Sequence, residues 1–116
     1  ETTVAVTMVG SVKGKNVMMF DDMITTAGTV CEAAKLARQH GAVGVYVAAT
    51  HAVFAGPAVE RLAEAGFNEI VVTDTIPQRP EVCARLKNLT VLSVSNLVGE
   101  AIRRIHEHRS VSALFG

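Results

Sequence analysis

Aromatic side chains are scarce in this sequence, which has no tryptophan, one tyrosine and four phenylalanines among its 116 residues. The chain is nevertheless 49% hydrophobic, so the core is predicted to be aliphatic, built from valine, alanine, leucine, isoleucine and methionine. A chain of this length supports one domain, residues 1–116, which buries about two-thirds of the surface of the unfolded chain. No Gly/Ser linker, internal repeat or low-complexity tract divides it.

An excess of charge is also missing, because 11 Lys and Arg residues balance 11 Asp and Glu residues. With a pI near 7.2, there is no electrostatic reason to expect nucleic acid or an acidic membrane surface as a partner. No apolar run approaches the roughly 20 residues of a membrane span, and no basic segment followed by an apolar stretch resembles a secretion signal. We therefore predict a cytoplasmic protein with no nucleic-acid or membrane partner.

Cysteine is the third scarce residue type. Cys31 and Cys83 are the only two and do not form a C-x-x-C motif, so we interpret them as reduced thiols, with a disulfide as the alternative. His51 has no ligand-type residue at metal-binding spacing, which favours a hydrogen-bonded structural histidine over a role at an active edge. His106 and His108 stand two apart in an expected helix, where they face different directions and cannot chelate one ion together. No metal site is predicted in this chain.

Short apolar runs alternate with segments of helical spacing. Strands are expected at residues 2–9, 16–21, 43–49, 69–73 and 90–94, and helices at residues 29–40, 56–65, 80–87 and 97–108. This alternation predicts an α/β fold of three layers, a mainly parallel sheet with helices on both faces. Ligands of such folds bind beyond the carboxyl ends of the strands.

The most informative segment follows the apolar strand at residues 16–21. Two adjacent carboxylates there can accept hydrogen bonds from neighbouring sugar hydroxyls or hold a hard cation. The backbone N–H groups at the start of the next helix suit a phosphate, and small residues allow an anion to approach the backbone closely. The candidate residues are Asp21, Asp22, Thr25, Thr26, Ala27, Gly28 and Thr29.

The alternative is a plain loop whose aspartates only begin a helix. Adjacent like charges repel each other unless something neutralises them, so the pattern favours a phosphorylated sugar as ligand. A second strand end, at residues 73–75, also carries hydroxyls and a carboxylate. It either lines the same crevice or shapes the turn that follows.

Residues 21–29 resemble the phosphoribosyl-binding loop of phosphoribosyltransferase-fold proteins, in the form used by ribose-phosphate pyrophosphokinase (PRPP synthase). That loop reads Asp-Asp-x-Ile-Asp-Thr-[Ala/Gly]-Gly-Thr. Residues 48–58 are similar to the family's Ala-Thr-His-x-x-Phe-[Ser/Ala]-Gly-x-Ala, and residues 72–77 to its Val-x-[Asn/Asp]-Thr-Ile-Pro. Residues 100–106 and 110–115 are similar to its carboxyl terminus. The resemblance runs nearly end to end, but it covers only the second domain of that family.

The resemblance implies a type I phosphoribosyltransferase-like fold and a place in the carboxyl-terminal half of a two-domain enzyme. The parent reaction would transfer the diphosphoryl group of ATP to ribose 5-phosphate with Mg²⁺, giving PRPP and AMP. Asp21 and Asp22 would face the ribose hydroxyls, and residues 25–29 would enclose the 5-phosphate. The ATP site, the metal ligands and the catalytic basic loop would lie upstream of Glu1. No catalytic residue is therefore expected in this chain, which alone would bind ribose 5-phosphate weakly, without Mg²⁺ and without turnover.

Further expectations follow from the same resemblance. The parent would be a hexamer, in which Ser110 and Ser112 contribute to a regulatory phosphate or ADP site between subunits; otherwise these serines form a turn and tail. From their position near a helix carboxyl terminus, and not from the resemblance, Arg103 and Arg104 most simply complement the dipole of that helix. Because Glu1 is not a start methionine, either an artificial boundary or cleavage in the upstream loop, or processing of a small unrelated protein, would explain the start.

Two other functions remain open. Thr25 stands where the family usually has a third aspartate, which admits a non-catalytic regulatory relative that binds catalytic partners. The intact pair Asp21 and Asp22 argues against that alternative. An ordinary phosphoribosyltransferase would need a hood that contacts the base, for which 116 residues leave little room.

Overall fold

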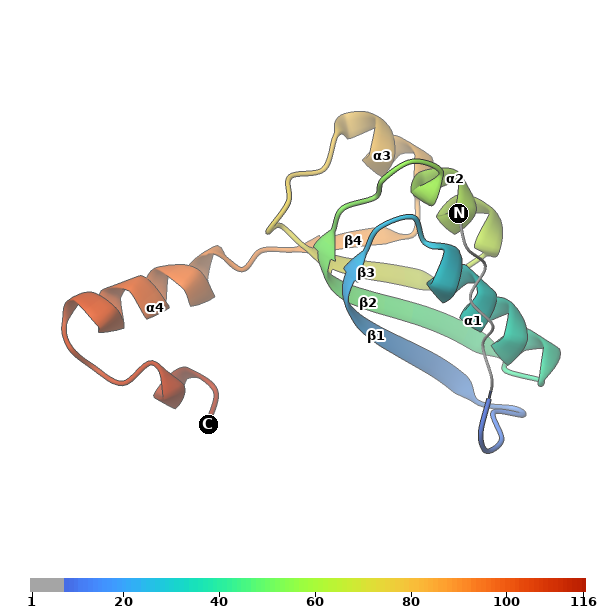
Figure 1. Cartoon of the computed structure of the whole chain (residues 1–116), viewed down its shortest axis with the longest axis horizontal. Coiled ribbons are helices and arrows are strands. Elements are labelled where there is room, and N and C mark those ends of the chain that lie inside the picture. Colours follow the sequence, from blue (N-terminus) through green and yellow to red (C-terminus); the bar gives the residue numbers. More distant parts are fainter. Residues whose placement is uncertain (1–7) are drawn as a thin grey trace.

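A parallel four-stranded sheet forms the centre of the chain, in a computed structural model that describes residues 8–116 (Figure 1). The strands are β1 (Asn16–Ile24), β2 (Gly44–Ala52), β3 (Glu69–Thr73) and β4 (Leu89–Leu92), and they lie in the order β1-β2-β3-β4. Each neighbouring pair is parallel, which confirms the predicted α/β class and parallel sheet. Of the strand expected at residues 2–9, residues 2–7 lie outside the described residues, and residues 8 and 9 are not in a strand.

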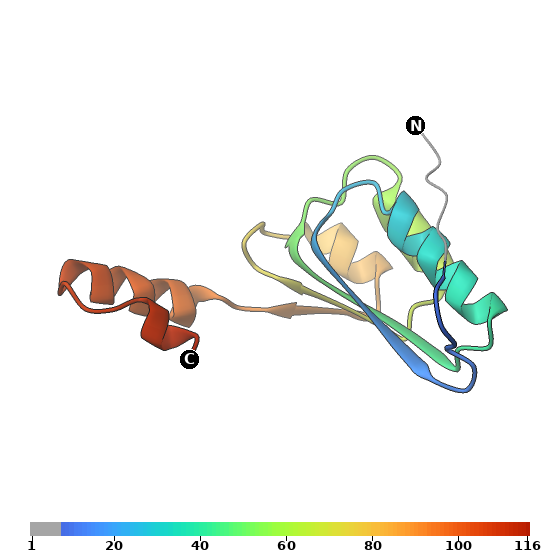
Figure 2. The ribbon, with the colours of Figure 1, turned by 60° about the horizontal axis from the view of Figure 1, so that its bottom comes forward.

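Three helices lie along one face of this sheet (Figure 2). They are α1 (Gly28–Gln39), α2 (Ala58–Ala65) and α3 (Pro80–Arg85). Each strand joins the same edge of the growing sheet, and connections of one hand then place every connecting helix on the same side. The second helical layer that was expected is therefore not present among residues 8–116. The other face carries Met18, Phe20 and Leu92, all of which are exposed.

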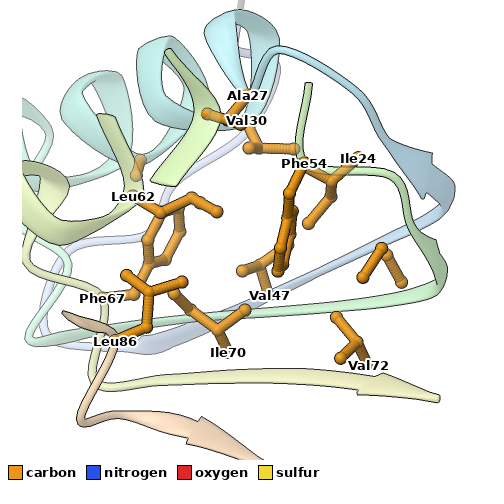
Figure 3. Packing of buried hydrophobic residues seen from close by; sticks show 14 of the residues in the cluster. Ile24, Ala27, Val30, Val47, Phe54, Leu62, Phe67, Ile70, Val72 and Leu86 are labelled. Atoms are coloured by element: carbon orange, nitrogen blue, oxygen red, sulfur yellow. The ribbon is translucent and has the colours of Figure 1, made fainter. Parts of the chain in front are cut away.

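The core fills the space between the sheet and these helices (Figure 3). Alternate residues of the strands point into it, because successive side chains of a strand face opposite ways. On β2 and β3 these are Val45, Val47, Ile70 and Val72, all buried. Apart from Phe54 and Phe67, the buried hydrophobic residues described are aliphatic, as the composition predicts.

The carboxyl-terminal part, α4 (Ser95–His106) and the short 3₁₀ helix η1 (Ser112–Leu114), projects away from the sheet (Figures 1 and 2). No residue of α4 is buried. Glu100 forms ion pairs with Arg103 at 2.8 Å and Arg104 at 3.0 Å, the spacing at which charges meet along a helix. Among the described residues, no helix has the length and apolar character needed to cross a membrane.

Candidate functional site

The two aspartates lie at the carboxyl edge of the sheet, inside β1 and not beyond its end. The strand was expected to finish at residue 21, but it continues to Ile24, which is buried and pairs with Ala52 of β2. Burial of Ile24 extends the pairing past the acid pair. Asp21 and Asp22 are both exposed, and the N–H of Asp22 donates to Oδ1 of Asp21 at 2.8 Å. Their carboxylates are therefore accessible to a ligand above the strand end.

The turn between β1 and α1 holds the remaining candidates. Thr25 and Thr29 are exposed, whereas Thr26 and Gly28 are half-buried. Ala27 precedes α1 with a φ of 66°, the left-handed region that L-residues seldom occupy, and it is buried. No side chain caps α1, and its first turn contains no acidic residue. The partial positive charge of this helix end is thus not opposed by a carboxylate in the first turn.

The carbonyl groups of residues 24–26 in this turn accept hydrogen bonds from donors on the segment after β2 and on α2. The bonds run from Val53 N and Phe54 N to Ile24 O (each 3.1 Å), from Ala55 N to Thr25 O (2.8 Å) and from Arg61 Nη1 to Thr26 O (3.1 Å). A planar trans peptide points its N–H opposite to its C=O, and the described residues contain no cis peptide. The N–H groups of residues 25–27 therefore point away from these donors. The backbone N–H groups of the turn thus face its outer side, away from the core.

Phe54 contacts the base of the turn on its core side, where its N–H donates to Ile24 O. Its backbone has a φ of 49°, and its ring lies in the core close to Ile24 and Val30 (Figure 3). Such a conformation is held only when surrounding contacts determine it. Residues 48–58 match a family motif, but the sequence pattern alone predicts no part in the site for Phe54 or Arg61. The sequence signal for Arg61 is its place in the helix expected at residues 56–65, near the apolar residues Ala58 and Leu62, which are fully buried in the structure.

His51 and the end of β3 form a hydrogen-bonded group beside the acid pair. His51 Nδ1 lies 2.8 Å from Thr75 Oγ1, and Thr73 Oγ1 donates to Thr50 O at 2.7 Å. Oδ1 of Asp74 accepts a hydrogen bond from the N–H of Val94. This bond is the main reason that the pKa of the Asp74 carboxyl is lowered, with the Ser93 hydroxyl adding to it. These contacts support the structural interpretation of His51 and favour turn shaping by residues 73–75.

A cavity of about 500 Å³ lies beside this turn, lined by residues 52–56 and 76–79. Its lining includes residues 53–55, whose N–H groups donate to the turn between β1 and α1, but none of residues 21–29. Gln78 spans its wall and donates to Ala52 O and Ile76 O. The acid pair and the helix end thus face an open edge and not this cavity.

The other candidates lie elsewhere. Ser110 Oγ and Ser112 Oγ are 2.8 Å apart, and Arg104 donates to Ser110 O at 3.2 Å, on the part of the chain that projects from the sheet (Figure 1). His106 and His108 are exposed. In the part of the chain that the structure describes, no group of three or more His, Cys, Asp or Glu side chains is arranged to hold a metal ion.

The cysteines are separate thiols. Cys31 is half-buried, Cys83 is exposed, and no bond joins them. Burial raises the pKa of Cys31 to about 11, and the charge of Glu32 also raises it, while Arg61 lowers it. At neutral pH this thiol is therefore protonated and a weak nucleophile.

These features define a parallel α/β domain whose carboxyl edge carries an exposed acid pair next to a helix amino terminus. Comparison with known families gives the particular group. The phosphoribosyl synthetase-associated domain family matches residues 2–116, and the chain belongs to this family.

Its relatives are ribose-phosphate pyrophosphokinases. The protein from Synechococcus elongatus is 55% identical over 109 residues, which are 93% of this chain and 32% of that protein. The protein from Rhodopirellula baltica is 53% identical over 91% of this chain and 33% of its own length. The crystal structure of phosphoribosylpyrophosphate synthetase from Mycobacterium smegmatis superposes with a TM-score of 0.82 at 46% identity, over 86% of this chain and 33% of that one. The chain thus spans about a third of the length of these relatives.

Proposed function

We propose that this chain is the ribose 5-phosphate-binding domain of a ribose-phosphate pyrophosphokinase, and that it belongs to the carboxyl-terminal half of a two-domain enzyme. Family membership and relatives at 53–55% identity support the parent activity. The observation that carries the binding role is the loop at residues 24–27, whose carbonyls are held inward while its amides point outward. Exposed carboxylates stand beside it on the same strand end.

Each part of the site has a chemical task in this proposal. Asp21 and Asp22 accept hydrogen bonds from the ribose hydroxyls, and residues 25–29 surround the 5-phosphate with backbone N–H groups and hydroxyls. The site holds the sugar so that its anomeric hydroxyl meets the diphosphoryl group of ATP, and such transfer depends on positioning and charge stabilisation. The groups that stabilise the transferred diphosphoryl are proposed to lie in the rest of the parent enzyme.

Magnesium belongs to the parent reaction in this proposal and not to this chain alone. Asp21 and Asp22 are the carboxylates at the edge, and Thr25 occupies the place of a third. Among the described residues no further acidic or histidine side chain completes a set of three. Mg²⁺ is usually bound by one or two carboxylates together with substrate phosphates, so in this proposal the acid pair would hold the ion only in the complete enzyme with its substrates bound. A cytoplasmic hexamer that binds ATP is proposed for the parent on family grounds.

Thr25 supports a second candidate, a non-catalytic relative that keeps the fold and binds catalytic partners. A threonine can still donate its hydroxyl to a phosphate, but it cannot offer a carboxylate to the sugar. Sugar-phosphate binding separates the two candidates, because the regulatory alternative does not require it.

An amide NMR titration with ribose 5-phosphate tests the proposal. Saturable shifts are expected at residues 21–29, and the double variant Asp21→Ala, Asp22→Ala should abolish them. The matched control is Glu81→Ala, Glu107→Ala, which changes the net charge equally at two exposed acids outside the loop. Inorganic phosphate alone should shift residues 25–29 but not the acid pair. Absence of shifts at millimolar ribose 5-phosphate would contradict the binding role of this chain.

A further inference from the structure

Arg61 reaches the loop between β1 and α1, which is the proposed phosphate site, from the neighbouring helix α2. It lies on α2, is half-buried, and donates from Nη1 to Thr26 O at 3.1 Å. Its neighbours Ala58 and Leu62 are fully buried, so α2 is anchored in the core at this level. A guanidinium on such an anchored helix presents its donors from a fixed direction, and a hydrogen bond from a charged donor is among the stronger ones in proteins.

This bond acts on the peptide between Thr26 and Ala27. Because the carbonyl of Thr26 is held towards Arg61, the N–H of Ala27 points the opposite way. Ala27 also has the left-handed φ of 66°, a backbone state that surrounding contacts must maintain. A donor fixed on the carbonyl that precedes Ala27 opposes rotation of this peptide into the ordinary extended or helical states.

The charge of Arg61 reaches the start of α1 as well. The guanidinium lowers the pKa of Cys31, opposing the effect of burial, and Cys31 N is bonded to Ala27 O at 3.1 Å. A phosphate at this helix end would lie well within the about 10 Å over which charges interact at ordinary ionic strength.

We infer that Arg61 is a positioning residue of the sugar-phosphate site, which fixes the Thr26–Ala27 peptide so that its N–H donates to the phosphate and adds a positive charge behind the loop. This inference rests on the proposed function and extends it to a residue that does not itself contact the sugar. Arg61 acts through the backbone of the loop, whereas Asp21 and Asp22 act on the ligand directly.

The chain contains a matched arginine at the opposite end of the same helix pair. Arg38 of α1 donates from Nη1 to Ala65 O and from Nη2 to Gly66 O, each at 2.6 Å. Arg38 thus joins the end of α1 to the end of α2, whereas Arg61 joins α2 to the loop that precedes α1, each through backbone carbonyls. Arg38 controls for lost charge and for lost helix-to-helix bonding.

The experiment is an amide NMR titration of the 116-residue chain with ribose 5-phosphate, in the wild type and in Arg61→Met, Arg61→Lys and Arg38→Met. Loss of a charged hydrogen-bond donor should weaken binding about tenfold or more in Arg61→Met. Arg61→Lys keeps a charge and a donor, so it should recover part of the affinity. Arg38→Met should bind within about twofold of the wild type, since its bonds lie far from the loop.

A second readout follows the peptide itself. The Ala27 amide of the unliganded chain should change its chemical shift and exchange faster with solvent in Arg61→Met, and return towards the wild-type values in Arg61→Lys. A folded Arg61→Met chain that binds like the wild type would overturn the inference while the proposed function stands. If Arg61→Met does not fold, Arg61→Lys is the deciding variant. An Arg61→Lys chain whose affinity for ribose 5-phosphate and whose Ala27 amide signal match those of Arg38→Met would overturn the inference. A wild-type chain that binds nothing overturns the proposed function together with this inference.

Discussion

Cys31 shows how one half-buried side chain links the first turn of α1 to stability. Burial raises the pKa of its thiol to about 11 from an ordinary value of 9.0, and Arg61 acts against this rise. The folded chain therefore holds the thiol proton more tightly than the unfolded chain does. A group of this kind contributes stability that is present below the unfolded pKa and is lost as the pH rises through the folded pKa.

The free energy of unfolding should accordingly fall between about pH 9 and pH 11, and part of that fall should belong to Cys31. Urea unfolding at pH 8 and at pH 10.5 measures it, in the wild type and in Cys31→Ala. The wild type should lose more stability over this interval than Cys31→Ala, which has no thiol to ionise. Equal losses in the two chains would show that Cys31 titrates alike in the folded and unfolded states.

At the scale of elements, α2 and α4 have similar amphipathic sequences but different surroundings. α2 places Ala58 and Leu62 fully inside the core. α4 has no buried residue, and its Ile102 is 62% exposed. The stability of a short helix in a protein comes mostly from packing of its apolar face. The two helices should therefore respond differently to the loss of an aliphatic side chain.

Leu62→Ala should lower the free energy of unfolding by about 2–5 kcal/mol, because it leaves a cavity between α2 and the sheet. Ile102→Ala should change it by no more than about 0.5 kcal/mol, as is usual for exposed positions. Urea unfolding followed by circular dichroism measures both. A cost for Ile102→Ala that matched the cost for Leu62→Ala would mean that α4 packs against the domain in solution.

The elements themselves were largely predictable from local patterns. The strand at residues 69–73 was predicted with its observed bounds, and helix α3 was placed within two residues of its observed end. The end of β1 was wrong, because its last residues are held by pairing with β2 and by burial of Ile24. The polar residues Asp21 and Asp22, which come before these last residues, indicate neither the pairing nor the burial.

The candidate site likewise has a part that local sequence predicts and a part that only the tertiary structure shows. Residue types and order at residues 21–29 were enough to predict a turn between a strand and a helix, whereas anion binding by that turn stays a prediction. The support of that turn was not predictable, because Arg61 and Thr26 are 35 residues apart and meet only through packing of α2 beside α1. The number of helical layers likewise depends on which edge each strand joins, and no local pattern encodes that choice.

As a whole molecule, the chain is extended for its size. Its radius of gyration is 16.7 Å, whereas a compact chain of this length has one of about 13 Å. Part of the difference comes from α4, which projects from the end of the sheet (Figure 1). The sheet face opposite α1–α3 also lacks a helix within residues 8–116, and Met18 and Phe20 stand on it with 57% and 76% of their surface exposed.

Clustered apolar side chains on an open sheet face should bind a hydrophobic dye. The folded chain is expected to enhance the fluorescence of 8-anilinonaphthalene-1-sulfonate at neutral pH, measured at low protein concentration. The double variant Met18→Ser, Phe20→Ser should reduce this enhancement, because it removes two neighbouring apolar side chains from the face. Val9→Ser is the control, since Val9 is 97% exposed but lies outside the sheet.

A dispersed amide spectrum in every variant would exclude loosened packing as the source of dye binding. An equal signal from the double variant and the control would contradict an accessible apolar face, and the open side of the sheet would then have to be covered in solution.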